Sequence, residues 1–147
     1  MNLQIKLPNI NNPVANYTAF KRVGDLLFVA GQTCRENGQM KFCGKVGKDL
    51  SIEQAKEASK LCALNILSQV KIACDGDLSK IKSCARLNVF VNCHHDFLEH
   101  AVVANGASDL MVEVFGENGK PTRTSVGVSS LPSNSAIEID AIFEFYK

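Results

Sequence analysis

An arginine and a glutamate near the end of the chain are the residues whose types and spacing point most directly to chemistry. Arg123 follows a turn signal at residues 116–121 and begins an alternating run that is typical of a strand. Thirteen residues separate it from the apolar segment 137–139, which Glu138 interrupts. If the two strands pair, the planar fork of Arg123 can bind a ligand carboxylate at two points, beside a glutamate available for proton chemistry. The spacing alone leaves an ordinary surface ion pair open.

The six cysteines and three histidines form a second set of reactive groups. No two cysteines make a Cys-x-x-Cys pair, so we expect free, buried thiols rather than disulfides. The cysteines are Cys34, Cys43, Cys62, Cys74, Cys84 and Cys93. Cys93, His94 and His95, with His100 nearby, could be taken for a metal cluster. We expect no metal there, because ligands adjacent in sequence rarely point at one ion.

Other familiar catalytic patterns are missing from the sequence. There is no Ser-His-Asp order, no Gly-x-Ser-x-Gly, no Walker loop and no dinucleotide fingerprint. Residues 44–48 (Gly-Lys-Val-Gly-Lys) superficially resemble a phosphate loop, but they lack its Gly-Lys-Ser/Thr ending. A formal charge of +1 argues against bulk attraction to nucleic acid or membranes. Without a long apolar run or a signal-peptide region, we expect a cytoplasmic protein.

The elements that must position these residues can be predicted from periodicity and turn signals. After a turn-rich start we expect a hairpin of strands 17–23 and 26–31 around Gly24-Asp25, with Gly31 at a bulge or a close ligand approach. A turn at 35–38 and a short strand over 39–43 follow. Ser51 and Gln54 form a capping box that begins a helix ending near Ala73.

The second half of the chain alternates strand and helix. We expect a strand within 81–91, a helix over 97–116, and strands at 122–128 and 136–146. Gly106 lies within the second helix, where glycine costs about 1 kcal/mol relative to Ala. Three explanations stay open: another group packs closely against the helix backbone there, the helix bends, or the weakness is simply tolerated. This order predicts one α+β domain over residues 1–147, a mixed sheet with two helices on one face. The last strand is apolar on both faces, which indicates subunit association.

Two long stretches carry a resemblance to a known family. Residues 123–132 (Arg-Thr-Ser-Val-Gly-Val-Ser-Ser-Leu-Pro), followed by 136–142, resemble the C-terminal signature of the reactive intermediate deaminase family, also called RidA, YjgF or L-PSP endoribonuclease-like. Residues 13–17 and 24–32 resemble the family's hairpin and its strand-ending Ser-Gly-Gln. The resemblance covers nearly the whole chain in the correct order.

The resemblance implies a chorismate-mutase-like two-layer fold, a barrel-like homotrimer and three clefts between subunits. Arg123 would clamp the carboxylate of a 2-imino acid or its enamine, a small carboxylate-bearing metabolite. Hydrolysis would then give a 2-ketoacid and ammonia without a cofactor, with Glu138 positioning or activating water. Tyr17 and Asn105 would line the cleft. The backbone at Ser125 and Gly31 would complete it.

The sequence also departs from the family pattern. Ala30 stands where a serine is common, and Thr124 where smaller residues are usual. Residues 105–116, which begin Asn-Gly-Ala-Ser-Asp-Leu, resemble a distinct and less characterised branch. A non-catalytic protein that binds a small carboxylic acid therefore stays an alternative. RNA cleavage is a further one, which the near-neutral charge disfavours.

Overall fold

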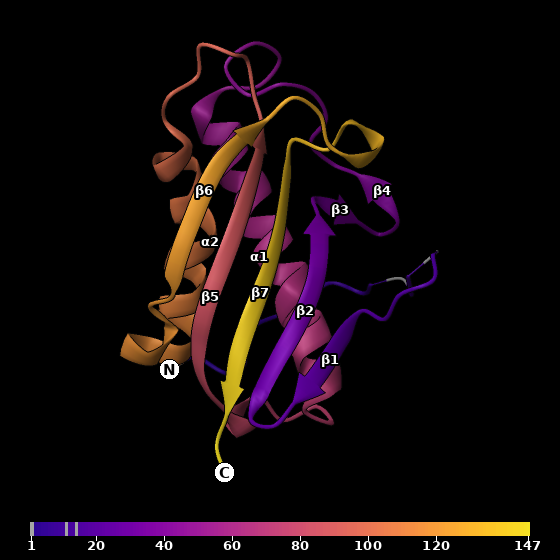
Figure 1. The fold of residues 1–147 in the computed structure, drawn as a ribbon, viewed down its shortest axis with the longest axis vertical. Helices are drawn as coiled ribbons and strands as arrows, with labels where there is room; N and C mark the ends of the chain where they lie inside the picture. The colour runs from indigo at the N-terminus through magenta and orange to yellow at the C-terminus, as the bar shows by residue number, and fades with distance from the viewer. Residues whose placement is uncertain (1, 11, 14) are drawn as a thin grey trace.

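The computed structural model describes residues 2–10, 12–13 and 15–147, and its centre is a five-stranded mixed sheet (Figure 1). The strands are β1 (Phe20–Val23), β2 (Leu26–Thr33), β5 (Ile81–Asn92), β6 (Thr122–Val128) and β7 (Ile137–Phe145). Their spatial order is β1-β2-β7-β5-β6, so β6 forms one edge. Only β5 and β6 run parallel. The predicted mixed sheet is confirmed.

Two helices, α1 (Ile52–Ala73) and α2 (His100–Phe115), lie behind the sheet as Figure 1 is drawn and cover one of its faces. The predicted start of α1 is confirmed, because the Gln54 amide donates to Ser51 Oγ and the Ser51 amide donates to Gln54 Oε1. The second helix begins at His100, three residues later than the edge of the predicted range. Short 3-10 turns occupy Leu78–Lys80, Gly116–Gly119 and Pro132–Asn134.

Three strand boundaries differ from the prediction. β1 begins at Phe20 rather than at residue 17, because the Tyr17 amide donates to Ala15 O and Thr18 Oγ1 donates to Phe20 O, bonds that hold a turn instead of a ladder. β2 continues beyond Gly31, although the bulge expected there is confirmed by a register shift between Val29 and Gln32. The predicted turn at 35–38 contains β3 (Arg35–Glu36), which pairs with β4 (Gln39–Met40).

Gly106 explains how closely the two helices pack. A Cβ at this position would lie 2.2 Å from the carbonyl oxygen of Lys56, a backbone atom of α1. Of the interpretations open from sequence, the approach of another backbone is the correct one. Glycine is required here because any side chain would push α2 away from α1, and with α2 the residues that it holds against β6.

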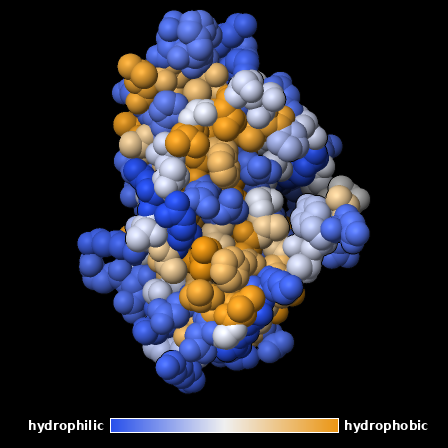
Figure 2. Space-filling model, in the orientation of Figure 1, coloured by the Kyte–Doolittle hydropathy of each residue, from blue (hydrophilic) through white to orange (hydrophobic). Residues whose placement is uncertain are grey.

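Alternation along β7 separates the two faces of the sheet. Ile137, Ile139 and Phe143 are fully buried beneath the helices, whereas Glu138 and Asp140 lie on the other face, half-buried. Figure 2 views this second face, where apolar atoms gather in two areas with polar atoms between them. Its exposed large apolar side chains include Leu26, Phe28 and Val126. In the described part of the chain, no helix is long and apolar enough to cross a membrane.

Candidate functional site

Arg123 is held against α2 by three hydrogen bonds. It lies in register with Leu87 on β5, so its side chain is on the helix-covered face of the sheet. Nη1 donates to Asn105 Oδ1 at 2.7 Å and to Ser108 Oγ at 3.0 Å, and Nη2 donates to Ala101 O at 3.3 Å. The three acceptors belong to successive turns along one side of α2. The guanidinium is thus fixed before any ligand arrives.

These bonds leave part of the guanidinium available. It carries five N–H groups, and the three bonds occupy both on Nη1 and one on Nη2. Among the described residues, the N–H on Nε and the second N–H on Nη2 have no acceptor. A carboxylate accepts two parallel N–H bonds from such a pair. Half-buried at an edge strand, Arg123 therefore presents an oriented guanidinium that is suited to binding an anion.

Sequence reasoning identified Asn105 but missed Ser108. The spacing of three residues that places both on one side of the helix was a readable signal. Ser125, the other predicted β6 residue, lies in register with Val89 and shares the face of Arg123. Arg123, Asn105 and Ser125 are thus brought together, and we call them the β6 half of the candidate site.

Glu138, Gly31 and Tyr17 form a second group, which we call the β2 half. Glu138 sits beside the bulge of β2, where a Cβ added to Gly31 would lie 3.0 Å from the Glu138 carboxyl carbon. Burial raises the pKa of Glu138 above its ordinary value, and the negative charge of Asp140 raises it further. A carboxyl with a raised pKa exchanges protons more readily near neutral pH.

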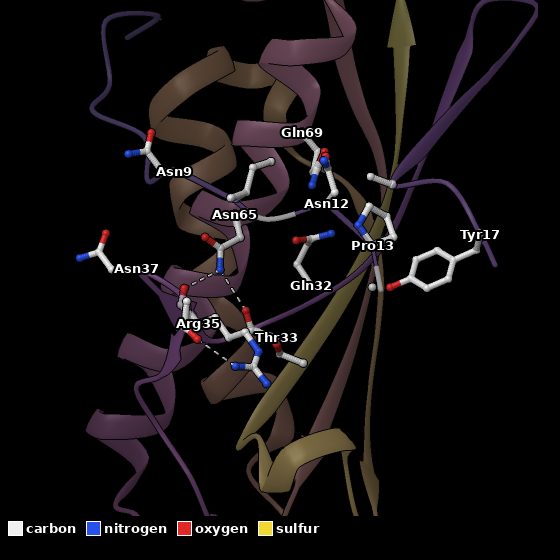
Figure 3. Close-up of a pocket in the computed structure, with 14 residues that line it drawn as sticks. Asn9, Asn12, Pro13, Tyr17, Gln32, Thr33, Arg35, Asn37, Asn65 and Gln69 are labelled. Atoms are coloured by element: carbon white, nitrogen blue, oxygen red, sulfur yellow. Dashed lines mark hydrogen bonds between the residues drawn. The ribbon is translucent and has the colours of Figure 1, made fainter. Parts of the chain in front are cut away.

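Tyr17 and Gly31 also line a cavity of about 360 Å³ between the N-terminal segment, β2 and α1 (Figure 3). Its wall contains two buried amides from α1, Asn65 and Gln69, each 3% exposed. Asn65 Nδ2 donates to the carbonyl oxygens of Thr33 and Arg35, at 3.0 and 2.9 Å, and so fixes the chain just after β2. That helix amides line this cavity was not predicted from the sequence.

The two halves do not meet within one chain. The Arg123 and Glu138 strands do not pair, so the condition for their convergence within one sheet is not met, because β5 lies between β6 and β7. Arg123 is in the row of Leu87 and Ala141 on the helix-covered face, whereas Glu138 is in the row of Phe90 and Val126 on the open face. The two strands are also about 10 Å apart, two strand spacings. Any site that uses both halves takes them from different copies of the chain.

The remaining reactive groups divide differently from the sequence expectation. All six cysteines are free, as predicted, but Cys43 is exposed and Cys93 only partly covered. Buried Cys34 has its pKa lowered to about 5, chiefly by a hydrogen bond from the thiol of Cys62. His94, His95 and Asp96 each bring one side-chain nitrogen or oxygen to the surface, and these atoms lie within 4.8 Å of one another. The sequence prediction did not include Asp96 in this group.

Comparison with known proteins identifies the family. The model described as "YjgF/chorismate_mutase-like, putative endoribonuclease" matches residues 1–145. The chain belongs to the YjgF/RidA family. Protein TCP17 of Trypanosoma cruzi is 41% identical over 143 residues, 97% of this chain and 89% of that protein. A crystal structure of a protein with unknown function from Agrobacterium tumefaciens is 47% identical, with a TM-score of 0.88 over 93% of this chain and 87% of that one.

A more distant YjgF/RidA relative carries a named activity. The 2-iminobutanoate/2-iminopropanoate deaminase of Dermatophagoides farinae is 23% identical over 138 residues, 94% of this chain and 92% of that protein. The family thus includes imine deaminases as well as proteins named for RNA cleavage. The chorismate-mutase-like α+β fold expected from the sequence is confirmed.

Proposed function

We propose that this protein hydrolyses 2-imino and 2-enamino acids to 2-ketoacids and ammonia, in clefts where the β6 half of one subunit meets the β2 half of another. The observation that carries the proposal is the fixed guanidinium of Arg123 with two N–H groups left for a carboxylate. The deaminase named among the relatives supports the reaction class.

Arg123 supplies binding and orientation. Clamped by its carboxylate, the substrate presents the adjacent imine carbon in one direction, and fixing two reactants in this way removes much of the entropic barrier. The imine carbon is already electrophilic, so the reaction needs a placed water more than a strong catalyst. No residue of the chain has to form a covalent bond with the substrate.

Glu138 then handles the protons. As water attacks the imine carbon, the carboxylate accepts a proton from it and passes it to the imine nitrogen, which gives a carbinolamine. The C–N bond then breaks as a second proton moves from the carbinolamine hydroxyl to the departing nitrogen, again through Glu138, and the ketone remains. The products are one 2-ketoacid and one ammonia for each imine and water consumed. The raised pKa of Glu138 suits a group that must both accept and return a proton.

A homotrimer is the assembly we propose for these clefts. Edge strand β6 and the apolar open face of the sheet are the surfaces that association would cover. The exposed side chains of Phe28 and Val126 favour covering of this face, because removing apolar surface from water lowers the free energy. In a closed ring, each subunit places its β6 half against the β2 half of one neighbour and its β2 half against the β6 half of the other, so every site is complete.

The activity is tested with imines generated in place by an amino-acid oxidase. We expect added protein to accelerate release of 2-ketoacid above the spontaneous rate. Arg123→Ala loses most of the acceleration, and Arg123→Lys, which keeps the charge but loses the fork, loses less of it. Failure of the wild-type protein to exceed the spontaneous rate with several side chains contradicts the proposal.

Mixed assemblies test whether the site is shared. Arg123→Ala and Glu138→Gln chains, each expected to retain little activity alone, are unfolded together and refolded. If a site takes one half from each of two chains, about one quarter of the sites contain both wild-type residues, and about that share of activity returns. Recovery of no activity, from mixtures shown by mass to contain both chains, contradicts a shared site.

The alternative function is binding of a small carboxylate without turnover. Ala30, at the bulge beside Gly31, supplies no hydroxyl to the β2 half. A ketoacid that raises the melting temperature of wild-type protein but not of Arg123→Ala, in a protein without deaminase activity, would establish this function instead.

A further inference from the structure

A cysteine and a histidine meet at the C-terminal ends of β5 and β6, at their arrowheads in Figure 1. Cys93 directly follows β5, and its segment is fixed because the Val46 amide donates to Asn92 O and the His94 amide donates to Val46 O. Cys93 Sγ lies 3.6 Å from Nε2 of His100, the first residue of α2. The proposed deaminase chemistry uses neither residue.

The pair opens into a cavity of about 740 Å³ that is separate from the one in Figure 3. Gly127 of β6 creates the access, since a Cβ there would lie 2.7 Å from both Cys93 Sγ and His100 Nε2. The Phe97 and His100 rings pack in a T-shaped arrangement, with centroids 5.3 Å apart, and this contact holds the imidazole in place. The two reactive atoms are thus adjacent, oriented and accessible.

The cavity is also basic. Its wall includes Lys45 and Lys48, and none of the described residues lining it is acidic. Asp96, an acidic neighbour of the wall in the sequence, lies against His94 and His95, at 3.8 and 3.2 Å.

The Lys45 ammonium is fixed by bonds to Asn92 Oδ1 at 2.9 Å and Ser129 O at 2.6 Å. Two of its three N–H groups are used, and it makes no ion pair with a described carboxylate. A fixed cation without a counter-ion attracts an anionic ligand.

We propose that Cys93, His100 and Lys45 form a second reactive site, one that takes a small carboxylate-bearing carbon electrophile. Lys45 holds the carboxylate. The thiol passes its proton to His100 Nε2, in the tautomer that carries its own proton on Nδ1. The sulfur electron pair forms a bond to the electrophilic carbon as the leaving group departs with the electrons of the broken bond.

Partial burial explains why the histidine is needed. It raises the pKa of the Cys93 thiol, and the nearby Lys45 charge opposes that rise. The thiol is therefore protonated at neutral pH, and a thiol reacts only after losing its proton. A base in contact with Sγ removes this barrier, as in other activated nucleophiles.

Alkylation with two reagents of similar size tests the site, one anionic (iodoacetate) and one neutral (iodoacetamide). Mass spectrometry of peptides measures the rate at each cysteine, with exposed Cys43 as the control within the same molecule. We expect the ratio of the iodoacetate rate to the iodoacetamide rate to be on the order of tenfold higher at Cys93 than at Cys43. Equal ratios at the two cysteines overturn the anion preference, whatever the deaminase assay shows.

Three variants assign the roles. Lys45→Gln lowers the ratio of the iodoacetate rate to the iodoacetamide rate at Cys93 to the value at Cys43. Lys41→Gln is the control, because Lys41 pairs with Glu36 away from the cavity, and it leaves the ratio at Cys93 unchanged. His100→Gln slows Cys93 with both reagents and leaves Cys43 unaffected. An unchanged Cys93 rate in His100→Gln overturns the Cys93–His100 pair. If that variant loses its fold, which reaction of the buried cysteines would reveal, the Lys45→Gln ratio decides alone.

Discussion

The β6 half and the β2 half of the candidate site are built in opposite ways. In the β6 half, helix α2 presents three acceptors that fix Arg123 before a ligand binds. In the β2 half, Tyr17 is 56% exposed on an irregular segment, and Glu138 borders a strand bulge. One half is rigid and cationic, while the other is open and carries the half-buried carboxyl of Glu138. Under the proposed function, recognition is prepared by the fold and the chemistry is completed on assembly.

Loss of the clamp has the largest expected effect. Arg123→Ala removes the only group of the β6 half that can neutralise the substrate carboxylate, which costs about 2–4 kcal/mol, or roughly 30- to 1000-fold in kcat/KM. Steady-state deamination measures it. Tyr17→Phe is the matched change in the β2 half, and we expect it to cost less than Arg123→Ala. A larger loss for Tyr17→Phe would reverse the assignment of the two halves.

Gly106→Ala tests whether the rigidity of the β6 half comes from helix packing. The added Cβ meets the Lys56 carbonyl, and neither backbone can move without separating α1 from α2. We expect a loss of about 1–3 kcal/mol in the free energy of unfolding, measured by urea denaturation. Gly31→Ala is the control, because its Cβ meets the end of a side chain that can rotate. Equal losses in the two variants would refute a special rigidity of the β6 half.

The sequence predicted the local elements of the fold better than the arrangement of the strands, for a physical reason. The capping box of Ser51 and Gln54 and the stripe of α1 are local signals, so that helix was predicted at both ends. The position of β5 between β6 and β7 depends on contacts between distant segments, which local patterns do not encode. For the same reason, the sequence singled out Arg123 and Glu138 as candidates but could not show whether their strands pair. The backbone approach at Gly106 became visible only once α1 and α2 were packed.

Asn105→Ala sharpens the account of the clamp with a smaller effect. Asn105 Oδ1 accepts the shortest of the three Arg123 bonds, at 2.7 Å, but Ser108 and Ala101 still hold the guanidinium in the variant. We expect a loss of about 1–2 kcal/mol, or roughly 5- to 30-fold in kcat/KM, with stability nearly unchanged. Ser108→Ala should behave similarly, and the double variant should lose more than the sum of the two. Strict additivity in this cycle would mean that the two acceptors do not act on one guanidinium.

Glu138→Gln changes stability by less than Gly106→Ala does and reveals the environment of the β2 half. Burial raises the pKa of Glu138, so the folded protein holds this proton to a higher pH than the unfolded chain does. The wild-type free energy of unfolding therefore falls as pH rises from below the unfolded pKa to above the folded one, because the charged form is penalised only in the folded state. Glutamine carries no charge, so the variant should match wild type near pH 3 and exceed it by less than about 1 kcal/mol near pH 7. Urea unfolding at one protein concentration measures this difference, which must grow with pH. A variant that loses stability toward neutral pH would show that the Glu138 carboxylate is stabilised by a partner, and the β2 half would then be as prepared as the β6 half.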